Sequence, residues 1–308
     1  MAVYVVGDFL RETRIRKGYT QEEVSYGICT TASLSRIENG AQKPGRLILE
    51  KLFERLGTEN DLFNTFVSRE EMELYSAIQN LIRDITDEDV IRLEEHIKLV
   101  EKMAKDASEL EHQCLYFAKG ELARQKEKDV TRAMEMYMKA IKITLPDFDG
   151  KKPLRNNLLT FDEIMIINSI AILYGNNEDI ITAIQLGMWL KEYMENKIVD
   201  GKMKTAKYPM ILYNLSCWFG NECSHREALD MASRGVDFCV KYGNLSAFPR
   251  LILNQGIASA ELGEVENAKK YLHQAVIILE VMKRMDTVEF ITAWCKKSIR
   301  LKFNIHQP

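Results

Sequence analysis

Residues 20–40 read TQEEVSYGICTTASLSRIENG, and this stretch predicts a helix, a sharp turn and a second helix. Thr20 followed by Glu23 is the pattern of a capping box, in which the two residues exchange hydrogen bonds at a helix N-terminus. Val24 and Ile28 lie four residues apart, so they share one face of the first helix. We expect that face to point into a core.

The second helix of this pair is expected to begin after Thr30 and to end at Asn39 and Gly40, residue types that suit a left-handed helix C-terminus. Leu34 and Ile37 recur at helical spacing and form its apolar face. Its outward residues are short or basic: Thr31, Ala32, Ser33, Ser35 and Arg36. A helix that lies in the major groove of DNA needs such a surface.

This segment closely resembles the helix-turn-helix of the phage-repressor-like (XRE-type) family. Within that family it is most similar to the Rgg/PlcR/PrgX group of bacterial quorum-sensing regulators, which join this domain to a peptide-sensing domain of helical repeats. The resemblance spans roughly residues 6–56, and the positions in family register are Arg14, Thr20, Gln21, Ile28, Ser35, Arg36, Ile37, Glu38 and Gly40. Cys29 departs from the pattern, because the wider family often has Gly at that turn position. The resemblance implies that Arg14 pairs with Glu38 inside the domain and does not touch DNA.

The composition is that of a globular protein with about two domains: 308 residues, 46% hydrophobic and 28% charged. No apolar run approaches about 18–20 residues, and no basic region precedes an apolar core at the N-terminus. We therefore expect a cytoplasmic protein with no membrane partner. The formal net charge is −3, so DNA binding must depend on the placement of a few basic residues.

The six cysteines form no C-x-x-C pair, and none has a histidine at zinc spacing. We expect reduced thiols and neither a metal nor another cofactor, with a redox switch as the alternative. The histidines are isolated, no H-E-x-x-H motif occurs, and no glycine-rich phosphate loop is present. The sequence therefore predicts no enzyme.

The helical periodicity predicts an all-α chain in three parts: a helix-turn-helix domain at 1–57, a hinge at 58–68 and a repeat domain at 69–308. The helix pairs of the repeat domain are expected at 69–83 with 87–104, 108–125 with 129–144, 161–175 with 178–196, 207–221 with 225–241, and 247–262 with 265–284. A last helix over 286–303 carries Trp294 and is expected to close the array or to form a dimer surface.

An internal repeat lies near the C-terminus, where residues 214–235 align on residues 254–275 with a shift of 40. Ala228 falls on Ala268, and small residues at this position let two helices approach closely. The pattern resembles the tetratricopeptide repeat, and the earlier pairs fit it more loosely. We therefore predict a right-handed α-solenoid of degenerate tetratricopeptide-like pairs after a phage-repressor-like helix-turn-helix domain.

Register with the family assigns roles in DNA binding to the second helix and its surroundings. The residues expected to face base edges are Thr31, Ala32 and Arg36, because Arg can bond guanine bidentately and methyl groups can meet thymine. The residues expected to hold phosphates are Gln21, Ser33, Asn39 and Lys43. The alternatives are that Arg36 is a solvated surface charge, and that the domain mediates only protein contacts.

Asn214 and Asn254 lie one repeat apart on the first helix of their pairs, which lines the concave surface of such an array. A side-chain amide can bond both the N–H and the C=O of an extended peptide. Other residues expected around this groove are Asn168, Tyr174, Tyr213, Cys217, Asn221, Leu253, Ile257 and Glu261. The family resemblance implies a short secreted peptide here. The alternative is that the asparagines cap turns or bond neighbouring carbonyls.

These observations predict a transcription regulator that binds palindromic operator DNA as a homodimer and is controlled by a short signalling peptide in its repeat domain. Peptide binding would act through the predicted hinge. The alternative function is a repeat-domain interaction module that sequesters a signalling partner, with DNA binding secondary. A repressor without a ligand is a third reading, which about 240 residues of repeat disfavour because dimerisation needs fewer.

Overall fold

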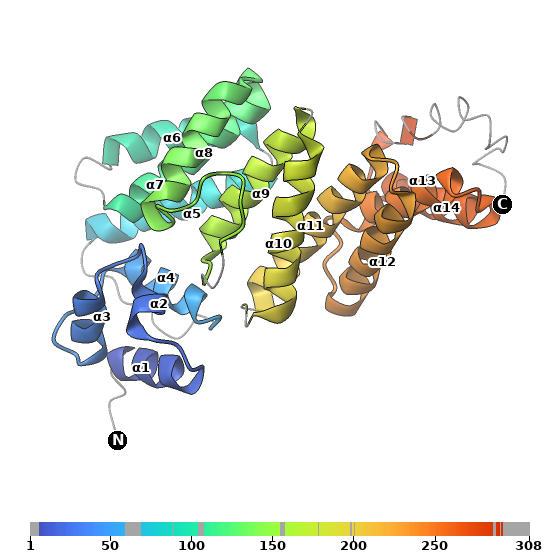
Figure 1. The fold of residues 1–308 in the computed structure, drawn as a ribbon. Coiled ribbons are helices and arrows are strands. Elements are labelled where there is room, and N and C mark those ends of the chain that lie inside the picture. Colours follow the sequence, from blue (N-terminus) through green and yellow to red (C-terminus); the bar gives the residue numbers. More distant parts are fainter. Residues whose placement is uncertain are drawn as a thin grey trace. The chain divides into compact units, whose positions relative to one another are not determined.

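The structure is a computed structural model. It describes residues 6–58, 69–87, 89–103, 108–154, 158–177, 179–197, 199, 201–285, 288, 289 and 291. These residues form helices and the turns between them and contain no strand, which confirms the all-α prediction (Figure 1). Nearly all of the predicted helix at 286–303 and of the predicted hinge lies outside the described residues.

The helices in chain order are α1 (Val6–Arg16), α2 (Gln21–Ser25), α3 (Thr31–Glu38), α4 (Arg46–Arg55), α5 (Arg69–Asp87), α6 (Val90–Met103), α7 (Glu109–Leu122), the π-helix η1 (Ala123–Glu127), α8 (Val130–Thr144), α9 (Phe161–Asn176), α10 (Ile180–Asn196), α11 (Gly201–Asn221), α12 (His225–Tyr242), α13 (Phe248–Glu261) and α14 (Val265–Val281). The five predicted helix pairs correspond to α5 with α6, α7 with α8, α9 with α10, α11 with α12, and α13 with α14. Most boundaries lie within three residues of the prediction.

The largest difference from the predicted boundaries is at a helix that contains a proline. The sequence predicts a start at 207, but α11 begins at Gly201 and contains Pro209. Proline has no N–H to donate to the carbonyl four residues earlier, which is that of Thr205. Asn244 Nδ2 donates to that carbonyl at 2.6 Å. The side-chain amide thus replaces the missing backbone donor, and the helix continues through the proline.

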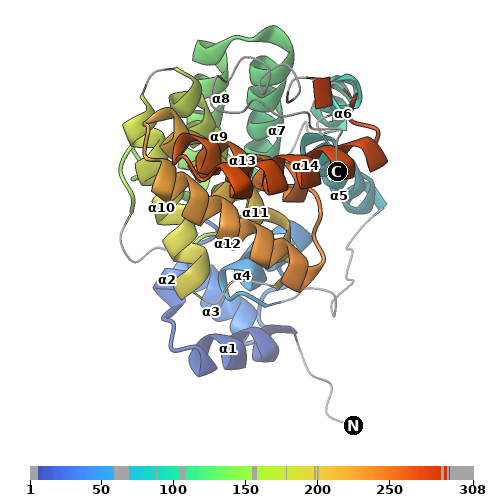
Figure 2. The ribbon, with the colours of Figure 1, turned by 90° about the vertical axis from the view of Figure 1, so that its right-hand side faces the viewer.

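The chain divides into two compact units, Met1–Leu173 with Lys197–Gly201, and Tyr174–Asn196 with Lys202–Pro308. Helices α1–α4 group together in the first unit, and we call them the N-terminal bundle (Figures 1 and 2). The predicted domain boundaries at 57 and 69 stay a prediction.

The predicted caps are present in the N-terminal bundle. Glu23 N–H donates to Thr20 Oγ1 at 3.1 Å, and Thr20 N–H donates to Glu23 Oε2 at 2.7 Å. Thr30 caps α3 by accepting a hydrogen bond from Ser33 N–H at 3.1 Å. Gly40 follows α3 with a φ of 70°, as the pattern at its C-terminus predicts.

The core of the N-terminal bundle is apolar and extends into later helices of the first unit. Its buried members from the bundle are Leu10, Val24, Ile28, Leu34, Ile37, Leu47, Leu49, Leu52, Phe53 and Leu56. Leu110 of α7 and Leu158, just before α9, belong to the same buried cluster. The bundle therefore shares one hydrophobic core with α7 and with the residues just before α9.

Helices α7, α8 and α9 are joined by the buried carboxylate of Glu121. Its Oε1 accepts hydrogen bonds from Tyr137 of α8 at 2.7 Å and from Ser169 of α9 at 2.6 Å. Its Oε2 accepts from Arg124 of η1 at 2.6 Å. Burial alone would raise the pKa of Glu121, but Arg124 and the other donors leave it lowered, so the carboxylate stays ionised.

In the second unit α13 packs between α12 and α14, and small residues at the contacts let these helices approach closely. A Cβ at Gly235 would lie 2.6 Å from Leu251 Cδ2, and one at Gly256 would lie 2.7 Å from Leu272 Cγ. Ala228 and Ala268 are buried at equivalent positions of α12 and α14. The shift of 40 residues thus corresponds to two successive helix pairs.

Candidate DNA-reading and peptide-binding sites

The outward face of α3 is accessible. Thr31, Ala32 and Arg36 are exposed, while Leu34 and Ile37 of the same helix are buried in the bundle core. Arg36 Nε donates to Gln42 Oε1 at 3.1 Å, just after the helix. The three residues predicted to read bases therefore lie on one solvent-facing surface, and their contact with DNA stays a prediction.

Arg14 and Glu38 form the internal ion pair that the family resemblance implies. Arg14 Nε lies 2.6 Å from Glu38 Oε1, and Arg14 Nη2 lies 2.8 Å from Glu38 Oε2. The bidentate pair fixes α1 against the buried C-terminal end of α3. Hydrogen bonding to Glu38 raises the pKa of Arg14 further. Glu38 is 1% exposed, so this pair supports α3 from within the bundle.

The residues predicted to hold phosphates have different surroundings. Gln21 is half-buried and donates one N–H to Glu38 Oε2 at 2.7 Å, which leaves its second N–H for a phosphate. Ser33 accepts a hydrogen bond from Thr30 Oγ1 at 3.0 Å. Asn39 and Lys43 are exposed. The phosphate roles of these residues stay a prediction.

The basic residues of the N-terminal bundle divide into two groups, which the sequence alone did not separate. Five are bonded inside the first unit: Arg14, Lys17, Arg46, Lys51 and Arg55. Four are exposed: Arg11, Arg16, Arg36 and Lys43. Arg11 Nη1 lies 3.4 Å from Asn39 Oδ1, at the end of α3. Arg11 therefore joins the exposed cations beside the reading helix, where the sequence analysis did not place it.

The opposite side of the bundle is held by buried charges. Arg55 of α4 and Glu163 of α9 form an ion pair of 2.7 Å in which both side chains are 0% exposed. Lys51 Nζ lies 2.9 Å from Asp162 Oδ2. Glu54 Oε2 accepts a hydrogen bond from Phe161 N–H at 2.9 Å. We call this set of contacts between α4 and the start of α9 the docking interface.

The turn before α3 adds a second contact to the same part of the first unit. Gly27 has a φ of 68°, and a Cβ there would lie 2.0 Å from the carbonyl oxygen of Thr144 in α8. Only glycine fits this position for both reasons. Gly27 thus supplies the left-handed turn residue, so the absence of Gly at Cys29 does not disturb the turn. Tyr26 donates its hydroxyl to Asp147; burial, followed by this hydrogen bond, raises the pKa of Tyr26 to about 12.

In the second unit, Asn254 of α13 is bonded to α11. Its Nδ2 donates to Ser216 Oγ at 2.6 Å and to Cys217 Sγ at 3.2 Å. Ser216 Oγ in turn donates to the carbonyl of Tyr213 at 2.7 Å. Asn254 thus bonds a hydroxyl and a thiol of α11, whereas the alternative expected a turn or neighbouring carbonyls, and its role in peptide binding stays a prediction. A peptide N–H would meet its carbonyl oxygen, because its N–H groups are donated to α11.

The other predicted groove residues of the second unit differ in exposure. Asn214 and Leu253 are buried, at 9% and 8% exposed. The half-buried members are Tyr174, Tyr213, Cys217 and Ile257, and the exposed members are Asn221 and Glu261. Asn168 of α9 is half-buried and belongs to the first unit, and its role in peptide binding stays a prediction.

One cation beside Asn254 is absent from the sequence-based set. Arg250 lies one turn before Asn254 on α13, and its guanidinium carbon is 5.8 Å from the centre of the Tyr213 ring. Its spacing of four residues from Asn254 is the signal that could have identified it. Burial raises the pKa of the neighbouring Cys217 thiol, so it stays protonated.

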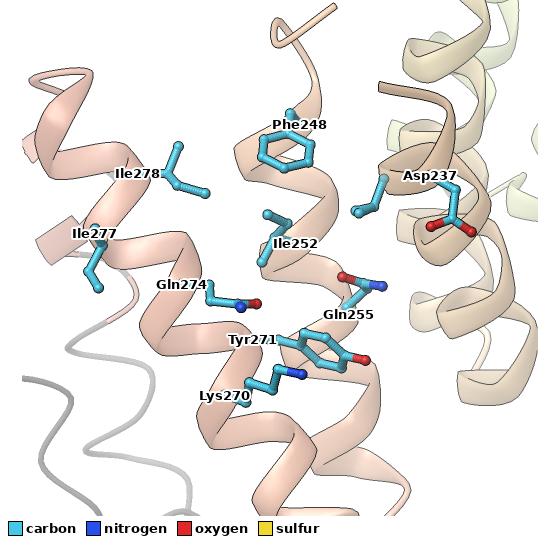
Figure 3. Close-up of a pocket in the computed structure, with 10 residues that line it drawn as sticks. Asp237, Phe248, Ile252, Gln255, Lys270, Tyr271, Gln274, Ile277 and Ile278 are labelled. Atoms are coloured by element: carbon cyan, nitrogen blue, oxygen red, sulfur yellow. The ribbon is translucent and has the colours of Figure 1, made fainter. Parts of the chain in front are cut away.

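A cavity of about 480 Å³ lies elsewhere in the second unit, between α12, α13 and α14 (Figure 3). Its apolar lining includes Phe248, Ile252 and Ile278, and its polar lining includes Gln255 and Lys270. None of the predicted peptide-site residues lines it. No sequence pattern predicts this cavity, because its lining residues on α13 do not include Asn254, the residue that the repeat singles out.

Comparison with known proteins identifies the N-terminal part. Residues 5–66 match the family described as "Helix-turn-helix domain". A protein of Bacillus subtilis strain 168, named uncharacterized HTH-type transcriptional regulator YqaF, is 38% identical over 56 residues, which are 18% of this chain and 74% of that protein. This chain belongs to the HTH-type transcriptional regulators.

Solved structures resemble this HTH-type regulator in fold along nearly its whole length. One is Bacillus thuringiensis PlcR in complex with the peptide PapR7 and DNA, with 17% identity, a TM-score of 0.60 and coverage of 93% of this chain and 98% of that chain. PlcR in its apo form has 16% identity, a TM-score of 0.57 and coverage of 93% and 97%. The combination of a helix-turn-helix domain with helical repeats, predicted from sequence, is thus confirmed at the level of fold.

No helix among the described residues is long and apolar enough to span a membrane. No cluster of three or more His, Cys, Asp or Glu side chains in the same residues could hold a metal ion.

Proposed function

We propose that this HTH-type regulator reads operator DNA with α3 and responds to a short peptide bound by α11 and α13. The observation that carries the DNA-reading proposal is the exposed surface of Thr31, Ala32 and Arg36 on a helix whose other face is fixed in a core. Arg suits bidentate bonding to guanine, and the two methyl groups suit thymine. Arg11 and Lys43 lie among the exposed cations that can neutralise phosphates.

The proposal includes a homodimer on palindromic DNA. Two helix-turn-helix domains read half-sites about 34–36 Å apart, or a multiple of that distance. The proposed function is cytoplasmic and requires neither a membrane partner nor a catalytic step.

The peptide proposal is supported by the polar chain that crosses from α13 to α11. Asn254, Ser216 and Tyr213 form a continuous series of hydrogen bonds there. The backbone N–H and C=O groups of an extended peptide could replace members of this series as hydrogen-bond partners. Such bonds do not depend on the side chains of the peptide. Arg250 adds a positive charge that suits an anionic group on the peptide. Resemblance in fold to a protein whose structure holds both a peptide and DNA also supports this proposal.

Peptide and DNA binding must be coupled reciprocally in such a protein. If the peptide favours the DNA-competent state, DNA must tighten peptide binding by the same factor. We propose that this coupling acts through the predicted hinge at 58–68. The docking interface adds buried polar contacts between the N-terminal bundle and α9 within the first unit.

Selection of binding sites from random duplex DNA by the full-length protein, at near-physiological salt, tests the DNA proposal. We expect enrichment of an inverted repeat, either by the protein alone or after addition of spent medium from the producing bacterium. Enrichment without the medium would mean that the ligand-free protein already binds operator DNA. Failure under both conditions would contradict the proposal and favour the protein-sequestering alternative.

Calorimetry with the active peptide isolated from that medium tests the peptide proposal. We expect the double variant Asn214→Ala with Asn254→Ala to bind at least about tenfold more weakly, since a lost hydrogen bond in a buried site is worth about 1–3 kcal/mol. Tyr271→Ala, which alters the cavity between α12 and α14, is the matched control. Unchanged affinity in the asparagine variant with loss in the control would move the peptide site to that cavity.

A further inference from the structure

The cavity between α12, α13 and α14 has an apolar wall of the kind that binds small organic molecules (Figure 3). Its volume of about 480 Å³ lies within the range of about 300–1,000 Å³ that is usual for ligand pockets. Phe248 and Ile252 of α13 and Ile278 of α14 supply apolar surface there, and Ile252 is 5% exposed. The wall therefore suits the apolar groups of a ligand.

The buried part of the cavity lining holds a hydrogen-bond acceptor that the described residues leave unused. Gln255 is 6% exposed, and its Nε2 donates to Ser233 Oγ of α12 at 3.0 Å. Its carbonyl oxygen has no donor among the described residues, and Figure 3 shows that oxygen turned away from α12. Buried polar side chains in proteins nearly always satisfy their hydrogen-bonding groups. A ligand N–H group in the cavity would supply the missing donor.

Two exposed side chains of opposite charge line the same cavity. Asp237 belongs to α12 and Lys270 to α14, the two helices that flank α13 (Figure 3). Neither forms an ion pair with a described residue, and Lys270 Nζ lies 6.0 Å from the centre of the Tyr271 ring. A ligand that meets both charges therefore carries a cationic group at one end and an anionic group at the other.

These requirements describe a very short peptide with free termini and apolar side chains. Neighbouring helix axes lie about 8–10 Å apart and an extended peptide spans about 3.3–3.6 Å per residue, so about two or three residues reach from α12 to α14. A free amino acid carries both charges on one carbon atom, so it cannot meet both helices. A fatty acid has no cationic group for Asp237 and no N–H group for Gln255.

We propose that this cavity binds an apolar di- or tripeptide, with its ammonium on Asp237, its carboxylate on Lys270 and a backbone N–H on Gln255. The apolar side chains of the ligand pack on the apolar wall. The site is separate from the one in the proposed function, because Asn254 bonds to α11 whereas Gln255 bonds to α12. This inference goes beyond the proposed function and does not depend on it.

Calorimetry of the full-length natural protein with leucyl-phenylalanine, phenylalanyl-leucine and leucyl-phenylalanyl-leucine tests this proposal, at low ionic strength, where exposed ion pairs are screened least. We expect at least one of the three to bind with a dissociation constant below about 1 mM. Acetylation of its N-terminus or amidation of its C-terminus removes one charge, and each change should weaken binding about three- to fivefold. Absence of binding by all three would overturn the proposal, and this result needs no variant to fold.

Two variants assign the ends of the bound peptide. In Asp237→Asn the free and the N-acetylated peptide should bind equally, because the partner of the ammonium is gone. In Lys270→Gln the free and the C-amidated peptide should bind equally for the corresponding reason. Lys269→Gln is the matched control: it removes the same charge from the preceding residue of α14, which pairs with Glu266 and does not line the cavity. It should behave like the natural protein.

Two results with these variants would also overturn the proposal. One is a loss of affinity in Lys269→Gln as large as that in Lys270→Gln, which would assign the effect to the charge of α14 as a whole. The other is an undiminished preference of Asp237→Asn for the free over the acetylated peptide, which would place the ammonium elsewhere. These measurements use neither operator DNA nor the signalling peptide, so their failure leaves the proposed function standing.

Discussion

The two faces of the N-terminal bundle use their charges in opposite ways. On α3, Arg36 is exposed, and its partners among the described residues are Gln42 and Ser33 of its own bundle. On α4, Arg55 and Lys51 are 1% and 2% exposed and bond to carboxylates of α9. One face leaves its cations available to an external partner, whereas the other commits them to the repeat helices.

This difference predicts opposite responses to substitution. A buried charge whose partner is removed remains desolvated and uncompensated, which is strongly destabilising. An exposed cation that is removed leaves nothing buried behind, so stability barely changes while binding to an anionic partner weakens. Substitutions on α4 should therefore act on stability, and substitutions on α3 should act on DNA recognition.

The largest expected effect comes from Arg55→Met, which leaves Glu163 buried without its cation. We expect the opening free energy of α4 to fall by about 3–5 kcal/mol, measured by native-state hydrogen exchange of its amides. Arg16→Met on the exposed side is the control and should stay within about 0.5 kcal/mol of the natural protein. A loss of less than about 1 kcal/mol in Arg55→Met would show that this ion pair does not hold the interface.

A medium effect is expected from Gly27→Ala, and Gly18→Ala is its matched control. Both glycines have positive φ angles, 68° and 77°, so alanine costs about 1–2 kcal/mol of backbone strain at either position. A Cβ at Gly27 also meets the Thr144 carbonyl oxygen, whereas at Gly18 nothing described lies within 4 Å. Thermal unfolding should show a greater loss for Gly27→Ala. Equal losses would mean that the turn does not pack against α8.

The smallest effect is expected from Lys43→Ala on the exposed side. Removal of one phosphate contact should weaken binding to all DNA sequences about equally and reduce the slope of log affinity against log salt by about 1. Fluorescence anisotropy at several salt concentrations measures both quantities. A change in sequence preference instead would indicate that Lys43 reads a base.

The parts of the fold that depend on nearby residues could be predicted from sequence. The capping box of Thr20 and Glu23 and the helix-ending Gly40 each follow from a few adjacent residues. Pairing of Arg14 with Glu38 followed from family resemblance, since the two lie 24 residues apart. The two successive helix pairs around Asn214 and Asn254 followed from their repeat.

The docking interface could not be predicted in this way. Arg55 and Glu163 are 108 residues apart, and no periodic pattern relates a charge on α4 to one on α9. The same holds for Asn244 and Thr205, which meet only because Pro209 leaves a carbonyl without its donor. Contacts between distant elements depend on how helices pack, and a single sequence does not encode that packing in any local signal.

We propose that α3 reads DNA through Arg36 while α4 is held by its contacts with α9. Parallel selection of binding sites from random duplex DNA by the natural protein, Arg36→Ala and Arg16→Ala tests it most directly, under whichever ligand condition supports enrichment. We predict that Arg16→Ala enriches the same inverted repeat as the natural protein. Arg36→Ala should lose its preference at one base pair in each half-site, about 1–3 kcal/mol of discrimination. Enrichment of an unchanged motif by Arg36→Ala would contradict this account and require another element to read the operator.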